Sequence, residues 1–187
     1  MQVDFADIGS SPFREDIDTI ARLGITTGCG GGNYCPANPV TRAQMAVFLL
    51  KAEHGSDFVP QLAVGHFLDV PPGSFAADWI EQLWREGIAA GCGGGNYCPD
   101  APVTRAQMAV FLLKTEHGSA FLPAACTGIF GDVACAPNPA FAVDWIERLY
   151  QEGVTAGCSQ NPLLYCPDAS VNRGQMATFL VKTLNLQ

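Results

Sequence analysis

The sequence is poor in basic side chains and in long apolar runs. Its 187 residues carry 10 Lys and Arg against 18 Asp and Glu, which gives a formal net charge of −8. General nucleic-acid binding needs a basic surface that displaces counterions, and a polybasic membrane contact needs clustered Lys and Arg. No apolar run approaches the roughly 20 residues of a transmembrane helix. We therefore expect neither nucleic-acid binding nor membrane insertion.

Recognisable motifs for catalysis, phosphate binding and metal binding are also missing. The glycine-rich stretches at 28–36 and 91–99 lack the GxxxxGK[ST] or GxGxxG spacing of phosphate-binding loops. No nucleophile, base and orienting group occur as a set. His54 and His117 suit the last turn of a predicted helix, and His66 precedes a repeat opening. We expect no enzymatic activity, no cofactor and no metal site.

One stretch is written three times and organises the rest of the chain. VTRAQMAVFLLK occupies 40–51 and again 103–114, and VNRGQMATFLVK follows at 171–182. Each copy starts with a capping box, in which a Thr or Asn and the Gln three residues later bond to the first backbone N–H groups. The apolar residues that follow cover several faces of the predicted helix. Three such helices are expected to pack on one another.

Each copy is preceded by the same shorter motifs in the same order. A motif FxD followed by Ile or Val opens the unit, and a first helix then ends at a glycine suited to a left-handed C-cap. A cysteine-containing loop leads from there to the repeated helix. The openings begin at Phe5, Phe67 and Phe130, and the glycines are Gly24, Gly87 and Gly153.

These motifs divide the chain into three repeats and two linkers. Each repeat is too small to bury much apolar surface alone, so we expect the three to pack into one composite, all-α domain of helix-loop-helix units. The predicted repeats are 1–55, 67–118 and 130–187, and the predicted linkers are 56–66 and 119–129.

The eight cysteines fall into four pairs that are close in sequence. Zinc ligands usually occur as CxxC pairs or with nearby histidines, and this spacing fits neither pattern, so local disulfides are favoured over a metal site. Each disulfide closes one small loop and stabilises the chain by about 2 kcal/mol. The predicted pairs are Cys29–Cys35, Cys92–Cys98, Cys126–Cys135 and Cys158–Cys166.

Disulfides indicate an oxidising compartment, which is the periplasm, the cell surface or the medium. The first residues after Met1 do not form the basic and then apolar segment of a signal peptide. We therefore expect a mature or recombinant piece of an exported protein.

Together these motifs resemble the S-layer homology module. The shared features are the FxD opening, the apolar helix, a GIxxG turn, an aromatic-Cys-Pro segment and a TRAE-like helix start, in three tandem copies over nearly the whole chain. The resemblance implies a three-pronged, pseudo-threefold spindle around a central three-helix bundle. It also implies non-covalent anchoring of exported proteins to an anionic cell-wall polysaccharide, for which pyruvylated sugar is the common ligand.

Three features depart from the family pattern. TRAE is TRAQ in two copies and NRGQ in the third, and the tryptophan of the family's WA motif is Phe13, Phe75 or Phe141. The paired cysteines indicate a lineage in which the usual polymer need not be present.

Arg42, Arg105 and Arg173 are the leading candidates for ligand binding. Each follows a cap residue, where a guanidinium and free helical N–H groups converge on one anion such as a pyruvyl carboxylate. The alternative is an ordinary pair with a surface carboxylate. We expect Arg173 to contribute least, and we expect replacement of all three to leave the stability nearly unchanged. The remaining candidates are the repeated Asp, Phe and Gly positions Asp7, Asp69, Asp132, Phe13, Phe75, Phe141, Gly28, Gly91 and Gly157.

Each repeated Asp has a second interpretation, since an aspartate can also cap a turn. The function itself has two interpretations. The first is a wall-polymer binding module, and the second is a self-assembling or scaffolding domain that contacts copies of itself or other surface proteins. An acidic chain must overcome overall repulsion to bind an anionic polymer, which keeps the second interpretation open.

Overall fold

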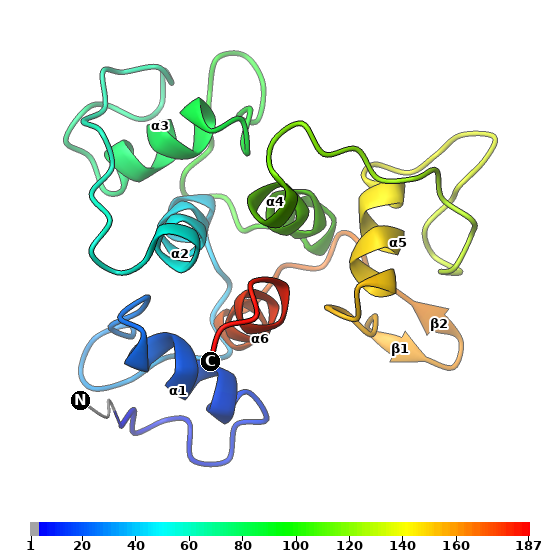
Figure 1. Ribbon diagram of the computed structural model, residues 1–187, viewed down its shortest axis with the longest axis horizontal. Helices are drawn as coiled ribbons and strands as arrows, with labels where there is room; N and C mark the ends of the chain where they lie inside the picture. Colours follow the sequence, from blue (N-terminus) through cyan, green and yellow to red (C-terminus); the bar gives the residue numbers. More distant parts are fainter. Residues whose placement is uncertain (1–3) are drawn as a thin grey trace.

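The computed structural model describes residues 4–187 and is built almost entirely of helices (Figure 1). The described part holds α1 (Arg14–Arg22), α2 (Arg42–His54), α3 (Ala77–Arg85), α4 (Arg105–His117), α5 (Val143–Gln151) and α6 (Arg173–Thr183), with a short antiparallel pair, β1 (Ser159–Gln160) and β2 (Leu163–Leu164). The predicted all-α class is confirmed.

The first three residues lie outside the described part of the chain. The signal-peptide prediction and the start of the predicted first repeat depend on them. None of the helices within 4–187 is both long and apolar enough to cross a bilayer.

The repeated stretches form the three central helices α2, α4 and α6 (Figure 1). Each starts with the predicted capping box, formed by Thr41 with Gln44 and by its two counterparts. The methionine and the leucine four residues later in each copy are fully buried, as are further apolar residues on other faces. This burial on several sides matches the all-round apolar pattern of the sequence.

A closed ring of backbone hydrogen bonds ties the three units together just before these helices. Val40 N–H donates to the carbonyl of Val171, Val171 N–H to that of Val103, and Val103 N–H to that of Val40, each at 2.9 Å. Each unit therefore bonds to both others, and all three valines are fully buried. An isolated unit would leave these buried polar groups without partners, so the ring favours one cooperative domain.

Each outer helix packs on the central helix of the preceding unit. Helix α3 packs on α2 and α5 packs on α4, so each of these pairs is joined by one predicted linker. Helix α1 packs on α6, which brings the start of the described chain close to its end (Figure 1). The unit of sequence repetition is therefore not the unit of packing.

Two buried carboxylates hold the chain segments that lead into the second and third units. Glu81 of α3 accepts hydrogen bonds from the backbone N–H groups of residues 64, 65 and 66 at 2.9, 2.6 and 2.7 Å. Glu147 of α5 does the same for residues 127, 128 and 129 at 2.6, 2.7 and 2.8 Å. Both side chains are almost completely buried, so these bonds are shielded from water.

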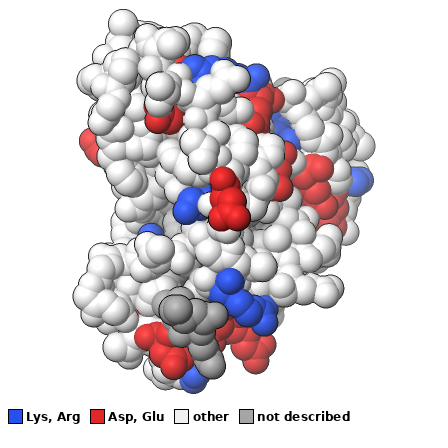
Figure 2. Space-filling view, turned by 60° about the vertical axis from the view of Figure 1, so that its left-hand side comes forward, with Lys and Arg blue, Asp and Glu red and all other residues white. Residues whose placement is uncertain are grey.

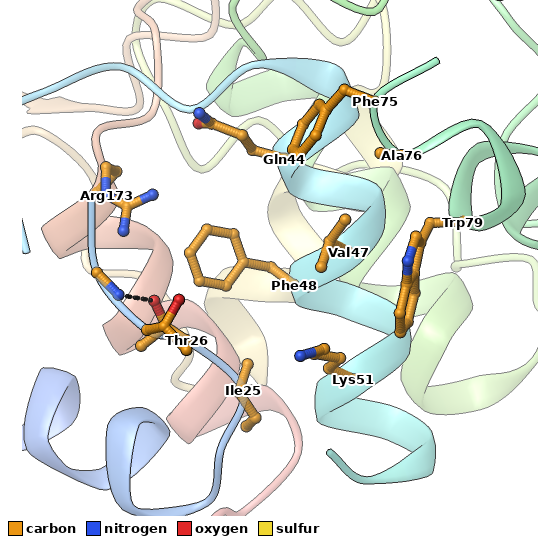
Figure 3. A pocket seen from close by; sticks show the side chains of 12 residues that line it. Ile25, Thr26, Gln44, Val47, Phe48, Lys51, Phe75, Ala76, Trp79 and Arg173 are labelled. Atoms are coloured by element: carbon orange, nitrogen blue, oxygen red, sulfur yellow. Dashed lines mark hydrogen bonds between the residues drawn. The ribbon is translucent and has the colours of Figure 1, made fainter. Parts of the chain in front are cut away.

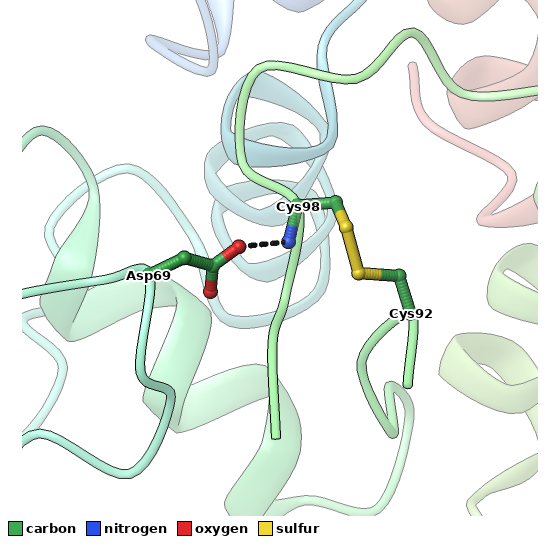
Figure 4. A group of neighbouring side chains, drawn as sticks. All are labelled: Asp69, Cys92 and Cys98. Atoms are coloured by element: carbon green, nitrogen blue, oxygen red, sulfur yellow. Dashed lines mark hydrogen bonds between the residues drawn. A yellow bond between two sulfur atoms is a disulfide. The ribbon is translucent and has the colours of Figure 1, made fainter. Parts of the chain in front are cut away.

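All four predicted disulfides are formed. The structure pairs Cys29–Cys35, Cys92–Cys98, Cys126–Cys135 and Cys158–Cys166, and the described chain has no free cysteine. Metal binding by the cysteines is thereby excluded, because a disulfide sulfur is no thiolate ligand. Figure 4 shows one bridge, Cys92–Cys98, beside Asp69.

Candidate functional site

The helix starts offer no free N–H groups to an anion, so this part of the sequence-based prediction is wrong. In α2, Arg42 N–H donates to the carbonyl of Ala101 at 2.9 Å and Ala43 N–H to that of Pro99 at 2.9 Å. The next N–H, on Gln44, is taken by the capping box. The same three groups are occupied at the starts of α4 and α6. The neighbouring unit and the cap residue together use these donors.

The three arginines that follow the cap residues are buried and support the fold. Each side chain crosses to the cysteine loop of the next unit in the ring, where its Nε donates to a tyrosine carbonyl at 2.7 or 2.8 Å. Its guanidinium carbon lies 4.6 Å from the centre of the same tyrosine ring. Burial lowers the pKa of each arginine, opposed by the nearby tyrosine and aspartate. The pairs are Arg42 with Tyr97, Arg105 with Tyr165 and Arg173 with Tyr34.

The three guanidinium groups differ in how many of their donors are used. Nη2 of Arg105 donates to the hydroxyl of Thr155 at 3.4 Å. The buried Nη2 atoms of Arg42 and Arg173 have no hydrogen-bond partner. In the loop facing Arg42, Ala89 stands where the third unit has Thr155, so no hydroxyl is available. A buried guanidinium N–H without an acceptor lowers the stability of the fold.

An open pocket of about 470 Å³ lies beside Arg173 (Figure 3). Its walls come from α2, from the start of α3 and from the loop at 25–28, which are distant in sequence. Figure 3 shows aromatic, amide and cationic side chains facing the same space. The main lining side chains are Arg173, Gln44, Lys51, Phe48, Phe75 and Trp79. Aromatic faces with a few cationic donors suit a sugar that carries a negative group.

Part of this arrangement recurs between α4 and α5. A pocket of about 420 Å³ is lined there by Lys114, Phe141 and Trp145, the counterparts of Lys51, Phe75 and Trp79. Phe75 and Phe141 are 70% and 69% exposed, so both rings are available to a ligand. The arginine equivalent to Arg173 is Arg42, whose guanidinium carbon lies 5.6 Å from the ring of Phe111, but neither Arg42 nor Phe111 lines this pocket. That contact repeats the one between Arg173 and Phe48 at 5.4 Å.

The corresponding place between α6 and α1 is different. Phe13 is the N-cap of α1, a position held by Ala76 in α3 and by Ala142 in α5, so Phe13 lies one residue further along than Phe75 and Phe141. Its ring lies against Gly174 of α6, where the other central helices have alanine. The structure therefore does not bear out the expected equivalence of the three phenylalanines.

A carboxylate also replaces an aromatic ring in this third place. Asp16 stands where the other outer helices have Trp79 and Trp145, and it accepts a hydrogen bond from the hydroxyl of Thr178. Arg105, the arginine of this side, is the one whose Nη2 already has a partner. The space between α6 and α1 is therefore filled by the protein's own Phe13, and the carboxylate of Asp16 lies beside it.

Gly174→Ala tests whether Phe13 fills this place. A Cβ at Gly174 would overlap the Phe13 ring, so we expect the substitution to destabilise the wild-type chain. In a Phe13→Ala background the overlap is gone, and alanine should then stabilise the helix by up to about 1 kcal/mol. Denaturant unfolding of the four proteins in this double-mutant cycle measures the coupling. An equal effect of Gly174→Ala in both backgrounds would contradict the contact.

The three repeated aspartates organise the cysteine loops. The two carboxylate oxygens of Asp7 accept from the backbone N–H groups of Tyr34 at 2.8 Å and Cys35 at 2.7 Å. Asp69 and Asp132 do the same in their units, as Figure 4 shows for Asp69 and Cys98. Burial would raise the pKa of Asp7, but the backbone hydrogen bonds outweigh it and lower that pKa. The aspartates thus bond to residues distant in sequence instead of capping the adjacent turn.

The three repeated glycines permit close packing of loop and opening motif. Gly28 has a φ of 87°, and a Cβ there would clash with the Asn33 carbonyl and the Phe5 ring. Gly91 and Gly157 have φ values of 88° and 83° and similar close contacts. Of these candidates, Gly28 also borders the pocket beside Arg173.

The sequence-based prediction missed several lining residues. Lys51 and Lys114 end the repeated stretch, and Trp79 and Trp145 stand in the related helix starts ADWIE and VDWIE. The available signal was that the lysine recurs in all three units, with Lys182 in the third copy, and that the tryptophan recurs in two units and is replaced by Asp16 in the remaining one. Lys51 lies 5.9 Å from the Trp79 ring, so one cation and one aromatic ring face the same pocket.

The sequence was compared with known proteins. Residues 4–46 and 66–109 each match the model of the S-layer homology domain. A cell surface protein of Thermoanaerobacter kivui is 30% identical over 114 residues, which is 59% of this chain and 15% of that protein. An exoglucanase of Acetivibrio thermocellus is 30% identical over 112 residues, 60% of this chain and 10% of that protein.

A further relative is an uncharacterized cell wall amidase of Bacillus anthracis, 30% identical over 107 residues, 57% of this chain and 19% of that protein. The chain thus spans only a small part of each of these relatives.

Proposed function

The chain belongs to the S-layer homology domain family, and from that premise we propose that it anchors its parent protein to the cell wall by binding an anionic polysaccharide. The module is a non-catalytic anchor of the cell surface. The pocket lined by Arg173 and Lys51 and the pocket lined by Lys114 are the proposed binding sites. A sugar carboxylate, such as that of a pyruvyl group, is the proposed anchor point within each.

The convergence of Arg173, Lys51 and Trp79 on one open pocket is the observation that carries this proposal. The second pocket repeats the lysine, the tryptophan and the exposed phenylalanine as Lys114, Trp145 and Phe141, while Arg42 is not among its lining residues. A carboxylate would supply acceptors to the guanidinium, and the lysine would add a second cation.

Local charge must overcome the overall charge of −8. On the face in Figure 2, basic and acidic side chains lie in small groups separated by wide uncharged surface. The described residues of this face form no broad basic surface along which a polyanion could bind. Two local sites, one with Arg173 and Lys51 and one with Lys114, fit this distribution better.

We further propose that the third place, beside Arg105, does not bind the polymer. Phe13 occupies it, Thr155 already accepts from Arg105, and Asp16 would repel an anion. This ranking reverses the expectation from sequence, in which Arg173 contributed least.

The test replaces Lys51 and Lys114 together by Gln, since neither lysine is buried in the core. We expect binding to purified wall polysaccharide to weaken about tenfold or more, because each charge-assisted contact contributes about 1.5–3 kcal/mol. Lys182→Gln, the equivalent change on α6, is the matched control and should bind like wild type. Co-sedimentation with wall fractions measures all three proteins.

The ligand chemistry is tested with the same wall fractions after chemical removal of pyruvyl groups. Wild-type protein should no longer sediment with the treated walls. Equal binding to treated and untreated walls would argue against the pyruvyl carboxylate. Wild-type affinity in the double lysine variant would instead argue against the two pockets.

One observation favours the alternative of a self-assembling domain. The predicted linkers expose large apolar side chains, namely Val59, Leu62, Val64 and Leu122, at 79–83% of their full surface. Such residues can contact other copies of the chain. Sedimentation velocity at rising protein concentration, with and without polysaccharide, separates the two functions. Concentration-dependent association in the absence of polysaccharide would support self-assembly.

A further inference from the structure

A cluster of Glu53, His54 and Glu86 lies away from the pockets, where α2 and α3 end. Nε2 of His54 is 3.1 Å from Oε1 of Glu86 and 3.8 Å from Oε2 of Glu53. One ligand atom from each residue lies within 4.8 Å of the other two. Tetrahedral zinc with bonds of about 2.0–2.2 Å places its ligand atoms about 3.3–3.6 Å apart. These three atoms therefore need only small shifts to share one ion.

The surrounding backbone favours a cation at this place. Glu53 and His54 are the last residues of α2, and Glu86 is the C-cap of α3. The negative ends of two helix dipoles therefore converge on the cluster. The His54 ring packs against Phe58, with ring centroids 4.4 Å apart, which restricts its orientation.

The net charge of the cluster also favours a bound cation. With a neutral imidazole, the two carboxylates give a charge of −2. Partial burial raises the pKa of Glu53, and the neighbouring Glu86 adds to this effect while His54 opposes it. The ammonium of Lys114 is near, but it donates to the carbonyl of Gly87 at 3.0 Å. The amide of Gln82, which donates to Glu86 at 2.8 Å, is neutral.

We propose that Glu53, His54 and Glu86 bind a divalent transition-metal ion of the zinc type, which clamps the ends of α2 and α3 together. One imidazole nitrogen and two carboxylate oxygens suit zinc better than calcium or magnesium, which prefer oxygen ligands alone. Water would complete the coordination. This proposal is independent of polysaccharide binding, because none of the three residues lines the pockets.

The next unit repeats the cluster with one decisive change. Glu116, His117 and Glu152 meet in the same way, with His117 Nε2 at 2.8 Å from Glu152 Oε1. Arg148 stands in the position of Gln82, and its Nε donates to the same oxygen at 2.6 Å. A guanidinium thus already offsets one of the two negative charges of this second cluster. We infer that zinc binds the first cluster and is excluded from the second.

The experiment is zinc titration of the full, disulfide-bonded chain by calorimetry, together with melting in zinc or magnesium. We expect one zinc ion per chain and a higher melting temperature in zinc alone. His54→Gln should weaken zinc binding by more than about tenfold, since loss of even a supporting residue costs 10–100-fold. His66→Gln is the matched control, because His66 stacks on Trp84 outside the cluster and should leave binding unchanged.

Two further variants keep the test independent of folding defects. Glu53→Gln preserves the side-chain shape and should also remove the zinc-dependent rise in melting temperature. Arg148→Gln converts the second cluster to the composition of the first, and we expect it to raise the stoichiometry from one to two. Wild-type zinc affinity in both His54→Gln and Glu53→Gln would overturn the proposed site. An unchanged stoichiometry in Arg148→Gln would overturn the assigned role of the arginine.

Discussion

Replacing Glu81 by Gln is expected to lower the free energy of unfolding by about 3–5 kcal/mol. Glu81 is completely buried and accepts hydrogen bonds from three consecutive N–H groups at 64–66. It also pairs with Arg85 at 3.0 Å. Glutamine has the same shape, but its amide nitrogen would face an N–H donor and the charge opposite Arg85 would be lost. The segment that leads into the second unit would then lose its attachment to α3.

Denaturant-induced unfolding measures this change. Glu15→Gln is the control, because Glu15 is exposed in the first turn of α1 and should shift the stability by at most about 0.5 kcal/mol. An unfolding midpoint of Glu81→Gln equal to that of Glu15→Gln would show that the carboxylate does not hold this segment.

The stability that the Glu81 carboxylate contributes is also expected to depend on pH. Burial would raise the pKa of Glu81, but the backbone hydrogen bonds and Arg85 outweigh it, so the folded-state pKa lies below the ordinary value. The carboxylate therefore contributes its full stability above the unfolded pKa of about 4.3 and loses it as the pH falls through the folded pKa. The stability difference between wild type and Glu81→Gln should shrink below about pH 4.

Arg105→Gln is expected to destabilise the protein by about 2–4 kcal/mol, in contrast to the expectation that these arginines can be replaced freely. Nε of Arg105 donates to the Tyr165 carbonyl at 2.8 Å, and its guanidinium lies over the Tyr165 ring. The shorter glutamine cannot reach that carbonyl while keeping the ring contact. The buried carbonyl of Tyr165 would lose its donor, and the contact between α4 and the loop closed by Cys158–Cys166 would weaken.

Arg14→Gln provides the comparison for this prediction. Arg14 is exposed and lies 3.7 Å from Asp18, a pair whose loss should be nearly neutral. Thermal and denaturant unfolding of both variants give the difference. Equal stability of the two variants would mean that the buried guanidinium is not needed for folding. Because Arg105 lies outside the two proposed binding pockets, wall binding by folded Arg105→Gln should be retained.

The local features of this protein follow from the sequence. Thr41 and Gln44 are three residues apart, so their capping box forms within one turn of chain. The cysteines of each pair are 6–9 residues apart, which allows each loop to close without knowledge of the rest of the fold. The repeated apolar pattern likewise predicts buried helices. Interactions of this kind depend on neighbouring residues, and sequence reasoning can reach them.

Part of the candidate site could also be predicted. The repeated arginines and exposed phenylalanines were identified, and Arg173 and Phe75 do line one pocket. Lys51 and Trp79 were not identified, because the sequence does not show that the end of α2 and the start of α3 face one space with Arg173. That meeting depends on Arg173 of α6 lying 5.4 Å from the ring of Phe48 of α2, a contact between residues far apart in the chain.

Only the tertiary structure decided what each repeated residue does. The repeat predicts three equivalent arginines at free helix starts, but the neighbouring unit supplies carbonyls to those N–H groups and buries each guanidinium over a tyrosine. The third place differs because Phe13 meets Gly174 across the whole length of the chain. Whether a polar group is free or already bonded depends on which distant segment packs against it, and packing between distant segments is fixed only when the whole core assembles.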